Sequence, residues 1–166
     1  MTATVARLKD LQFRLEYALL RTIVAGVRAV PLDRATAFSA RWWRRLAPIV
    51  SPKRHKRALA NLAIAFPDKT PQEREHLALA AWENLGRVMA ETMQLDRLVK
   101  DPSRISIANP KVFNRYNGKL GPIVGCSLHL GNWELAIWPL TLAGARPAAV
   151  YRSVNNPYVD QYLRDQ

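Results

Sequence analysis

Apolar and polar positions recur at helical spacing at the start of the chain. In residues 5–30 an arginine occurs every seven residues, which is about two helical turns, so the four arginines line one stripe of a helix. The rest of that helix surface is mostly apolar. The pattern predicts an amphipathic helix with a basic stripe of Arg7, Arg14, Arg21 and Arg28 and an apolar face of Leu8, Leu11, Leu15, Ala18, Leu19, Ile23 and Val27.

Two interpretations of this helix remain open. It can lie in a membrane interface with its arginines toward lipid phosphates, or it can be a packed helix whose basic stripe is solvated. A second basic cluster, Arg-Trp-Trp-Arg-Arg, lies at residues 41–45. It fits two interpretations equally well: a segment in the lipid headgroup zone, and an ordinary helix with two half-buried tryptophans. The membrane interpretation predicts that Arg14, Arg21, Arg28, Trp42 and Trp43 bind lipid.

Two further helices are predicted from their first residues. Ser51 and Pro52 precede a helical stretch over residues 53–66. Thr70, Pro71 and Glu73 form a capping box with proline at the first helical position, which predicts a helix to about residue 95. Apolar positions at helical spacing inside it indicate packing rather than a cofactor site.

After residue 101 the pattern changes to short β-like segments at 104–108, 122–127 and 146–151, with a helix expected over 132–143. Strand, helix and strand at this spacing predict a βαβ unit with parallel pairing. The expected fold class is therefore α/β, with N-terminal helices followed by the start of a mixed sheet. We expect basic, membrane-associating helices over residues 1–50 and the start of an α/β domain over 51–166.

Composition narrows the class of protein. The chain has 166 residues, 49% of them hydrophobic, and one cysteine, so it can form a core but no internal disulfide. Of its net charge of +12, residues 1–57 carry most, with 13 Lys and Arg against 3 acids. An anionic surface is the expected partner, and since no nucleic-acid-binding pattern is present we expect a membrane rather than nucleic acid.

No uncharged run approaches the ~20 apolar residues that span a bilayer, and the start lacks the apolar core of a signal peptide. We therefore expect peripheral or monotopic association with a membrane.

Candidate chemistry lies in the sequence His-Leu-Gly-Asn-Trp-Glu at residues 129–134, here called the His-Glu block. It follows a predicted buried strand and opens a predicted helix. A turn at Gly131 would let the Glu134 carboxylate fold back onto the His129 imidazole, fix its tautomer and leave the other ring nitrogen as a base for a substrate hydroxyl. A purely structural histidine is the competing interpretation.

Other chemistries fit the sequence less well. Ser127 lacks the glycine pattern of a nucleophile elbow, and Cys126 is expected to point into the core of its strand. A metal site at His129 and Glu134 would need His55 or His76, which lie in charged helical stretches. Direct transfer of an acyl group to an alcohol needs only the base and its orienting carboxylate.

Three segments resemble one known family in the order in which that family has them. The His-Glu block is similar to the H-x-G-N-W-E motif of the bacterial lipid A biosynthesis late acyltransferases, the lauroyl and myristoyl transferases. Residues 61–67, Asn-Leu-Ala-Ile-Ala-Phe-Pro, resemble that family's N-terminal region, and residues 150–152 and 155–157 resemble the segments after its catalytic helix. The resemblance runs from about residue 5 to residue 166.

The resemblance implies a glycerol-phosphate-acyltransferase-like fold with His129 as general base, Glu134 as its orienting group and no cofactor. The donor would be a fatty acyl thioester on acyl carrier protein, and the acceptor a hydroxyl of a lipid A precursor at the cytoplasmic face of the bacterial inner membrane, which supplies anionic lipids. Arg152 is expected to bind phosphate or the oxyanion, and Asn132 to cap the catalytic helix or to bind substrate.

Members of that family extend further, so the resemblance implies that the chain is the N-terminal half of such an enzyme. Residues 51–166 would be the N-terminal part of its acyltransferase domain, with part of the sheet and of the acyl-chain pocket beyond residue 166. Two other functions stay open: a non-catalytic, membrane-binding fragment, and transfer to a phosphatidylinositol mannoside.

Overall fold

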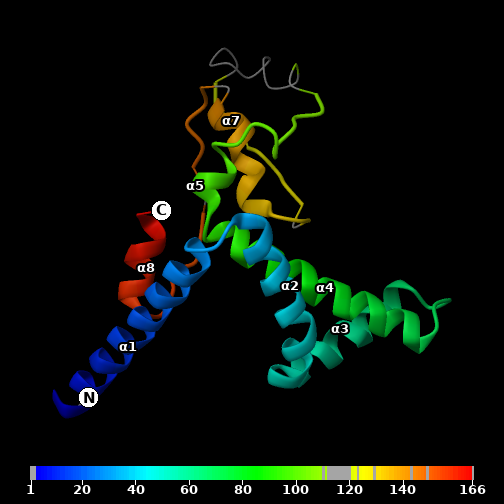
Figure 1. Cartoon of the computed structure of the whole chain (residues 1–166), viewed down its shortest axis with the longest axis horizontal. Helices are drawn as coiled ribbons and strands as arrows, with labels where there is room; N and C mark the ends of the chain where they lie inside the picture. Colours follow the sequence, from blue (N-terminus) through cyan, green and yellow to red (C-terminus); the bar gives the residue numbers. More distant parts are fainter. Residues whose placement is uncertain are drawn as a thin grey trace. The chain divides into compact units, whose positions relative to one another are not determined.

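The computed structural model describes residues 3–109, 111, 121–122, 124–128, 130–142, 144–148 and 150–165. Every regular element in this part of the chain is a helix (Figure 1). The chain divides into two compact units, Met1–Ala29 with Ala148–Gln166, and Val30–Pro147. The elements in chain order are α1 (Ala3–Arg28), α2 (Leu32–Val50), α3 (Pro52–Ala65), α4 (Pro71–Thr92), α5 (Leu95–Leu98), η1 (Trp133–Ile137), α7 (Trp138–Leu142) and α8 (Pro157–Arg164).

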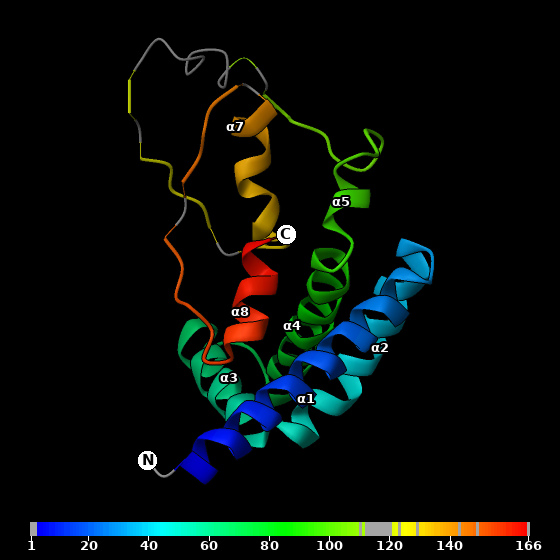
Figure 2. The same ribbon diagram turned by 90° about the vertical axis from the view of Figure 1, so that its left-hand side faces the viewer.

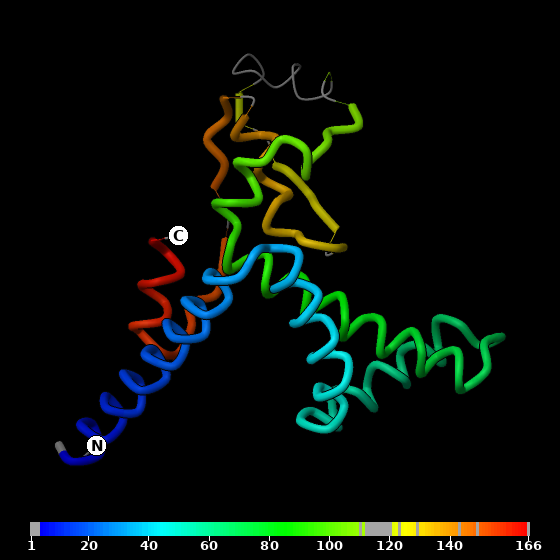
Figure 3. The backbone as a smooth tube through the Cα atoms, viewed as in Figure 1, coloured from blue at the N-terminus to red at the C-terminus, as the bar shows by residue number. Residues whose placement is uncertain are grey.

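The larger unit is organised around α4. Helix α2 packs along α4, and α3 runs outward before α4 returns beside it (Figure 3). The buried residues of this packing are mostly small, which lets the helix axes come close. They include Ala35, Ala40 and Ala47 from α2, and Ala78, Gly86, Val88 and Ala90 from α4.

Helices α2 and α4 approach each other closely at Gly86. The Ser39 hydroxyl donates a hydrogen bond to the Gly86 carbonyl oxygen at 2.7 Å. A Cβ atom at residue 86 would lie 2.7 Å from the Ser39 carbonyl oxygen and 2.9 Å from the Trp43 Cβ. Only glycine therefore fits this crossing of α2 and α4 without a backbone shift.

The predicted start of α4 is confirmed. The Thr70 hydroxyl accepts from the Glu73 amide at 3.2 Å, and the Glu73 carboxylate accepts from the Thr70 amide at 2.7 Å. These bonds satisfy amides that the first helical turn cannot pair internally and lower the pKa of Glu73.

The helices predicted over 5–30 and 53–66 are also confirmed, as α1 and α3.

A buried histidine joins α3 to α4. The Nε2 atom of His55 lies 3.1 Å from a carboxylate oxygen of Glu75, and the Trp82 indole N–H donates to His55 Nδ1 at 3.1 Å. Because Nδ1 accepts, Nε2 carries the proton and donates to Glu75. The Trp82 ring also stacks on Trp43 of α2 with centroids 6.1 Å apart, so one side chain connects three helices.

We expect Trp82→Phe to destabilise the larger unit by about 1–2 kcal/mol, because it leaves the buried His55 Nδ1 without its donor while most of the ring packing stays. Urea unfolding followed by circular dichroism measures this. Trp42→Phe is the matched control, since Trp42 is 55% exposed. Equal losses in the two variants would contradict the role given to the indole N–H.

The smaller unit consists of α1, α8 and the segment before α8 (Figure 2). Asn156 begins α8: its side-chain oxygen accepts from the Tyr158 and Val159 amides, and its side-chain amide donates to the Phe13 carbonyl of α1 at 2.9 Å. The buried Asp160 forms an ion pair with Arg164 and accepts from the Val154 amide, which lowers its pKa. The Asn156 amide thus holds α8 against α1, and Asp160 holds the preceding segment against α8.

The predicted α/β fold class is wrong for the described part of the chain, which contains no strand and no βαβ unit. Residues 104–108 and the described residues of 122–127 and 146–151 are irregular. A strand gains its hydrogen bonds only from a neighbouring strand, and these segments do not pair with one another. Val124 and Val150 are accordingly exposed, at 93% and 106%, whereas Ile105 and Ile107 are partly buried.

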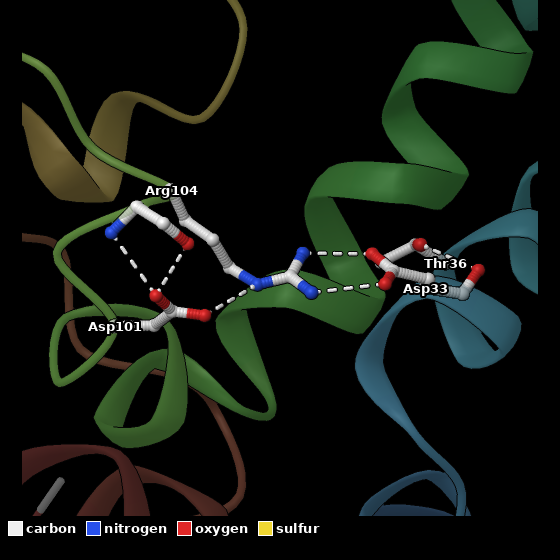
Figure 4. A network of polar contacts seen from close by, with 5 residues as sticks. Asp33, Thr36, Asp101 and Arg104 are labelled. Atoms are coloured by element: carbon white, nitrogen blue, oxygen red, sulfur yellow. Dashed lines mark hydrogen bonds and ion pairs between the residues drawn. The ribbon is translucent and has the colours of Figure 1, made fainter.

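Arg104, expected in a strand, has a different role. Its guanidinium donates two hydrogen bonds to the Asp33 carboxylate, at 2.7 and 2.9 Å, and a third to Asp101 (Figure 4). Asp101 also accepts from the amide and hydroxyl of Ser103. This network pins the segment after α5 to the start of α2 and raises the pKa of Arg104, so the backbone turns here instead of extending.

The helix predicted over 132–143 forms in two parts, η1 and α7. Pro139 explains why the helix is divided. A proline has no amide to donate to the carbonyl four residues earlier, so an α-helical ladder cannot run unbroken through it. The preceding turn closes with 3₁₀-type bonds instead, and the amide after η1 donates to the Leu135 carbonyl.

Candidate active site

The described part of the His-Glu block forms a turn followed by a short helix. Gly131 adopts a left-handed φ of 56°, which favours glycine because it has no Cβ. Asn132 follows, and its carbonyl accepts from the Leu135 amide at 3.2 Å. Glu134 lies exposed in the first turn of η1. His129 lies outside the described residues, so its predicted pairing with Glu134 stays a prediction.

Asn132 does not cap η1 through its side chain, so that expectation is wrong. Its side-chain amide turns instead to α4 and donates to a carboxylate oxygen of Glu91 at 3.0 Å. The side-chain oxygen of Asn132 is buried and has no hydrogen-bond partner among the described residues. The block is thereby attached to α4, which packs against α2 and α3.

The segment before the block is open to solvent. Cys126 is exposed, so the expectation that it points into a core is wrong. Ser127 is exposed as well, and the side chains of Leu128 and Leu130 are 75% and 73% exposed. An apolar surface therefore flanks the position of His129 in the sequence.

Arg152 is exposed and lies in the segment that leads to α8. It belongs to the smaller unit, whereas Asn132 and Glu134 belong to the larger one. Its predicted contact with phosphate or with the oxyanion stays a prediction.

Two arginines of the basic stripe contact aromatic rings of α8. The Arg14 guanidinium lies 5.4 Å from the ring centroid of Tyr158, and that of Arg21 lies 5.1 Å from the centroid of Tyr162. Arg14 also pairs with Asp10, whose pKa is lowered by the Tyr158 hydroxyl and by Arg14. Each of these arginines thus stabilises the α1–α8 packing, and its predicted contact with lipid stays a prediction.

The other residues predicted to bind lipid are Arg28, Trp42 and Trp43, and they differ in what they contact. Arg28 lies in the last turn of α1. Trp43 stacks on Trp82 inside the larger unit, whereas Trp42 is exposed and stacks on the exposed Phe38, with centroids 5.8 Å apart. Of the two tryptophans, only Trp42 presents a large apolar surface to solvent.

The sequence analysis missed Glu91. Glu91 follows the buried Val88 by three residues, which places it beside the packed face of α4. That position was a usable signal, because an acid beside a buried face needs a partner. The partner is 41 residues away in the sequence, and no local pattern identifies it.

Comparison with known proteins identifies the class as acyltransferase. The family described as bacterial lipid A biosynthesis acyltransferase matches residues 9–166. No curated protein and no solved structure matches the chain. Because the family match covers nearly the whole sequence, the chain belongs to the bacterial lipid A biosynthesis acyltransferases, as the three resembling segments predicted.

Proposed function

We propose that the chain moves a fatty acyl group from acyl carrier protein to a hydroxyl of a lipid A precursor at the cytoplasmic face of the bacterial inner membrane. The observation that carries this proposal is the His-Glu block within a chain that belongs to the lipid A acyltransferases. A histidine with a carboxylate supplies a base for an alcohol, and the thioester already supplies an activated acyl group, so the reaction needs no cofactor.

In the proposed mechanism one ring nitrogen of His129 takes the proton of the acceptor hydroxyl as its oxygen attacks the thioester carbonyl. Glu134 accepts a hydrogen bond from the other ring nitrogen and stabilises the imidazolium that forms. The carbon–sulfur bond then breaks, and the imidazolium returns the proton to the leaving thiolate. The exposed Glu134 and the left-handed turn at Gly131 support this arrangement, because the turn lets the chain reverse between the two residues.

Association with the membrane surface is part of the proposal, and α1 supports it. Six of its apolar residues recur every three or four positions and are 46–63% exposed. They lie on the side of the helix away from Tyr17, Arg14 and Arg21, which contact α8. None of the helices in the described ranges combines the length and apolar character needed to cross a bilayer. The exposed residues are Val5, Leu8, Leu11, Leu15, Leu19 and Ile23.

The test is acyl transfer by the purified chain from lauroyl- or myristoyl-acyl carrier protein to a lipid A precursor with free hydroxyls on its acyl chains, in vesicles containing anionic lipid. Mass spectrometry should detect a new acyl ester on the precursor. A phosphatidylinositol mannoside is the parallel acceptor, and its preferential acylation would contradict the proposed substrate. Salt-sensitive binding to the vesicles with no ester on either acceptor would instead indicate a non-catalytic membrane protein.

A further inference from the structure

The hydrogen bond between α4 and the His-Glu block has a fixed direction, with Asn132 as donor and Glu91 as acceptor. A carboxylate only accepts hydrogen bonds, whereas the Asn132 side chain has both a donor amide and an acceptor oxygen. The amide of Asn132 faces the Glu91 carboxylate, because the opposite orientation would bring two acceptor oxygens together at 3.0 Å. Glu91 therefore determines which end of the Asn132 side chain points away from α4.

The end that points away is the carboxamide oxygen, which is buried without a hydrogen-bond partner among the described residues. A buried acceptor in this state costs stability, so such atoms in folded proteins are few and are associated with ligands or function. It can be satisfied by an N–H or O–H group, and it repels phosphate and carboxylate. Asn132 is three residues after His129 and two before Glu134. Its side-chain oxygen is therefore an acceptor within the His-Glu block.

We propose that Glu91 is a positioning residue for acyl transfer, which holds Asn132 so that its carboxamide oxygen accepts a hydrogen bond from a neutral N–H or O–H group of a substrate. This inference rests on the proposed function. The reacting hydroxyl gives its hydrogen to His129, so the donor to Asn132 is a different group. The acceptor lipid can provide it, and so can the amides of the pantetheine arm that carries the acyl thioester.

Steady-state kinetics with Glu91→Ala test the proposal and separate the two sources. Loss of an oriented hydrogen bond should raise the KM of the substrate that makes it about tenfold, while the KM of the other substrate stays unchanged. Glu91→Gln should recover most of the affinity, because its side-chain oxygen can still accept from the Asn132 amide. Glu83→Ala is the matched control: it removes a carboxylate from the same helix, where Glu83 pairs with Arg44 and Arg87.

Unchanged KM values in Glu91→Ala, an equal rise in both, or a Glu91→Gln variant as impaired as Glu91→Ala would overturn the positioning role. Asn132→Asp is the second variant if Glu91→Ala does not fold; it sets a carboxylate against Glu91 and should raise the same KM. The side-chain amide NMR signal of Asn132 should also move in Glu91→Gln, and a signal that does not move counts against the contact. A wild-type chain without any acyl transfer would refute the proposed function itself, while this signal still reports on Glu91.

Discussion

Gly86→Val is expected to unfold the larger unit or to destabilise it by at least ~3 kcal/mol, which is a large part of a domain's usual stability. The first atom of any side chain at this position would lie 2.7 Å from the Ser39 carbonyl oxygen and 2.9 Å from the Trp43 Cβ. Neither atom is the free end of a flexible side chain, so α2 would have to move away from α4. Such a movement would also break the Ser39–Gly86 hydrogen bond.

Thermal and urea unfolding of the whole chain, followed by circular dichroism, measure the effect. Gly86→Ala should also destabilise, but less, because alanine gains about 1 kcal/mol in helix propensity over glycine. Gly26→Ala in α1 is the control, since nothing lies within 4 Å of a Cβ built there and the same propensity should make it neutral or stabilising. A Gly86→Val protein with the wild-type midpoint would refute the close crossing of α2 and α4.

Local signals were enough to predict α3 and α4. The capping box at Thr70 and Glu73 and the proline at residue 52 act within one turn of chain, so the sequence around them contains the whole interaction. The crossing at Gly86 is different. A single glycine inside a helical pattern indicates either a weak helix or a close contact, and the sequence does not say that Ser39 lies opposite.

The strand predictions failed because a strand is defined by its partner. The apolar run before the His-Glu block is short, and short apolar runs do not distinguish a buried strand from other structures. In the described residues Val124, Cys126 and Leu128 are all exposed, so this run has no packed face to fix its conformation. Ion pairs also override local propensity, as Arg104 does through Asp33 and Asp101.

For the candidate site, the sequence indicated the residue types but not their supports. Glu134 and Asn132 were recognised from their spacing to His129, whereas Glu91 was not, because the contact that matters is between α4 and a turn far along the chain. The arginines of α1 show the same limit. Their seven-residue repeat predicted a stripe, but only the fold shows that Arg14 and Arg21 contact the tyrosines of α8.

His129→Ala is expected to lower the rate of acyl transfer by about 10³-fold, within the range of 10²–10⁴ that a positioned general base contributes. Glu134→Ala should have a smaller effect, because the imidazole remains as a base but loses the carboxylate that orients it. Groups that act as one unit are not additive, so the double variant should be no slower than His129→Ala alone. Equal and independent losses that multiply in the double variant would contradict a His129–Glu134 pair.

These kinetic losses should occur without loss of structure. Glu134 is exposed on η1, so its truncation leaves the packing of α2, α3 and α4 intact, and the unfolding midpoint should equal that of wild type. His76→Ala is the matched control for His129→Ala: His76 is an exposed histidine of α4 outside the block, and its removal should change neither the rate nor the midpoint. A His129→Ala protein that folds normally and transfers acyl groups at the wild-type rate would exclude His129 as the base, and the reaction would then have to start from another group.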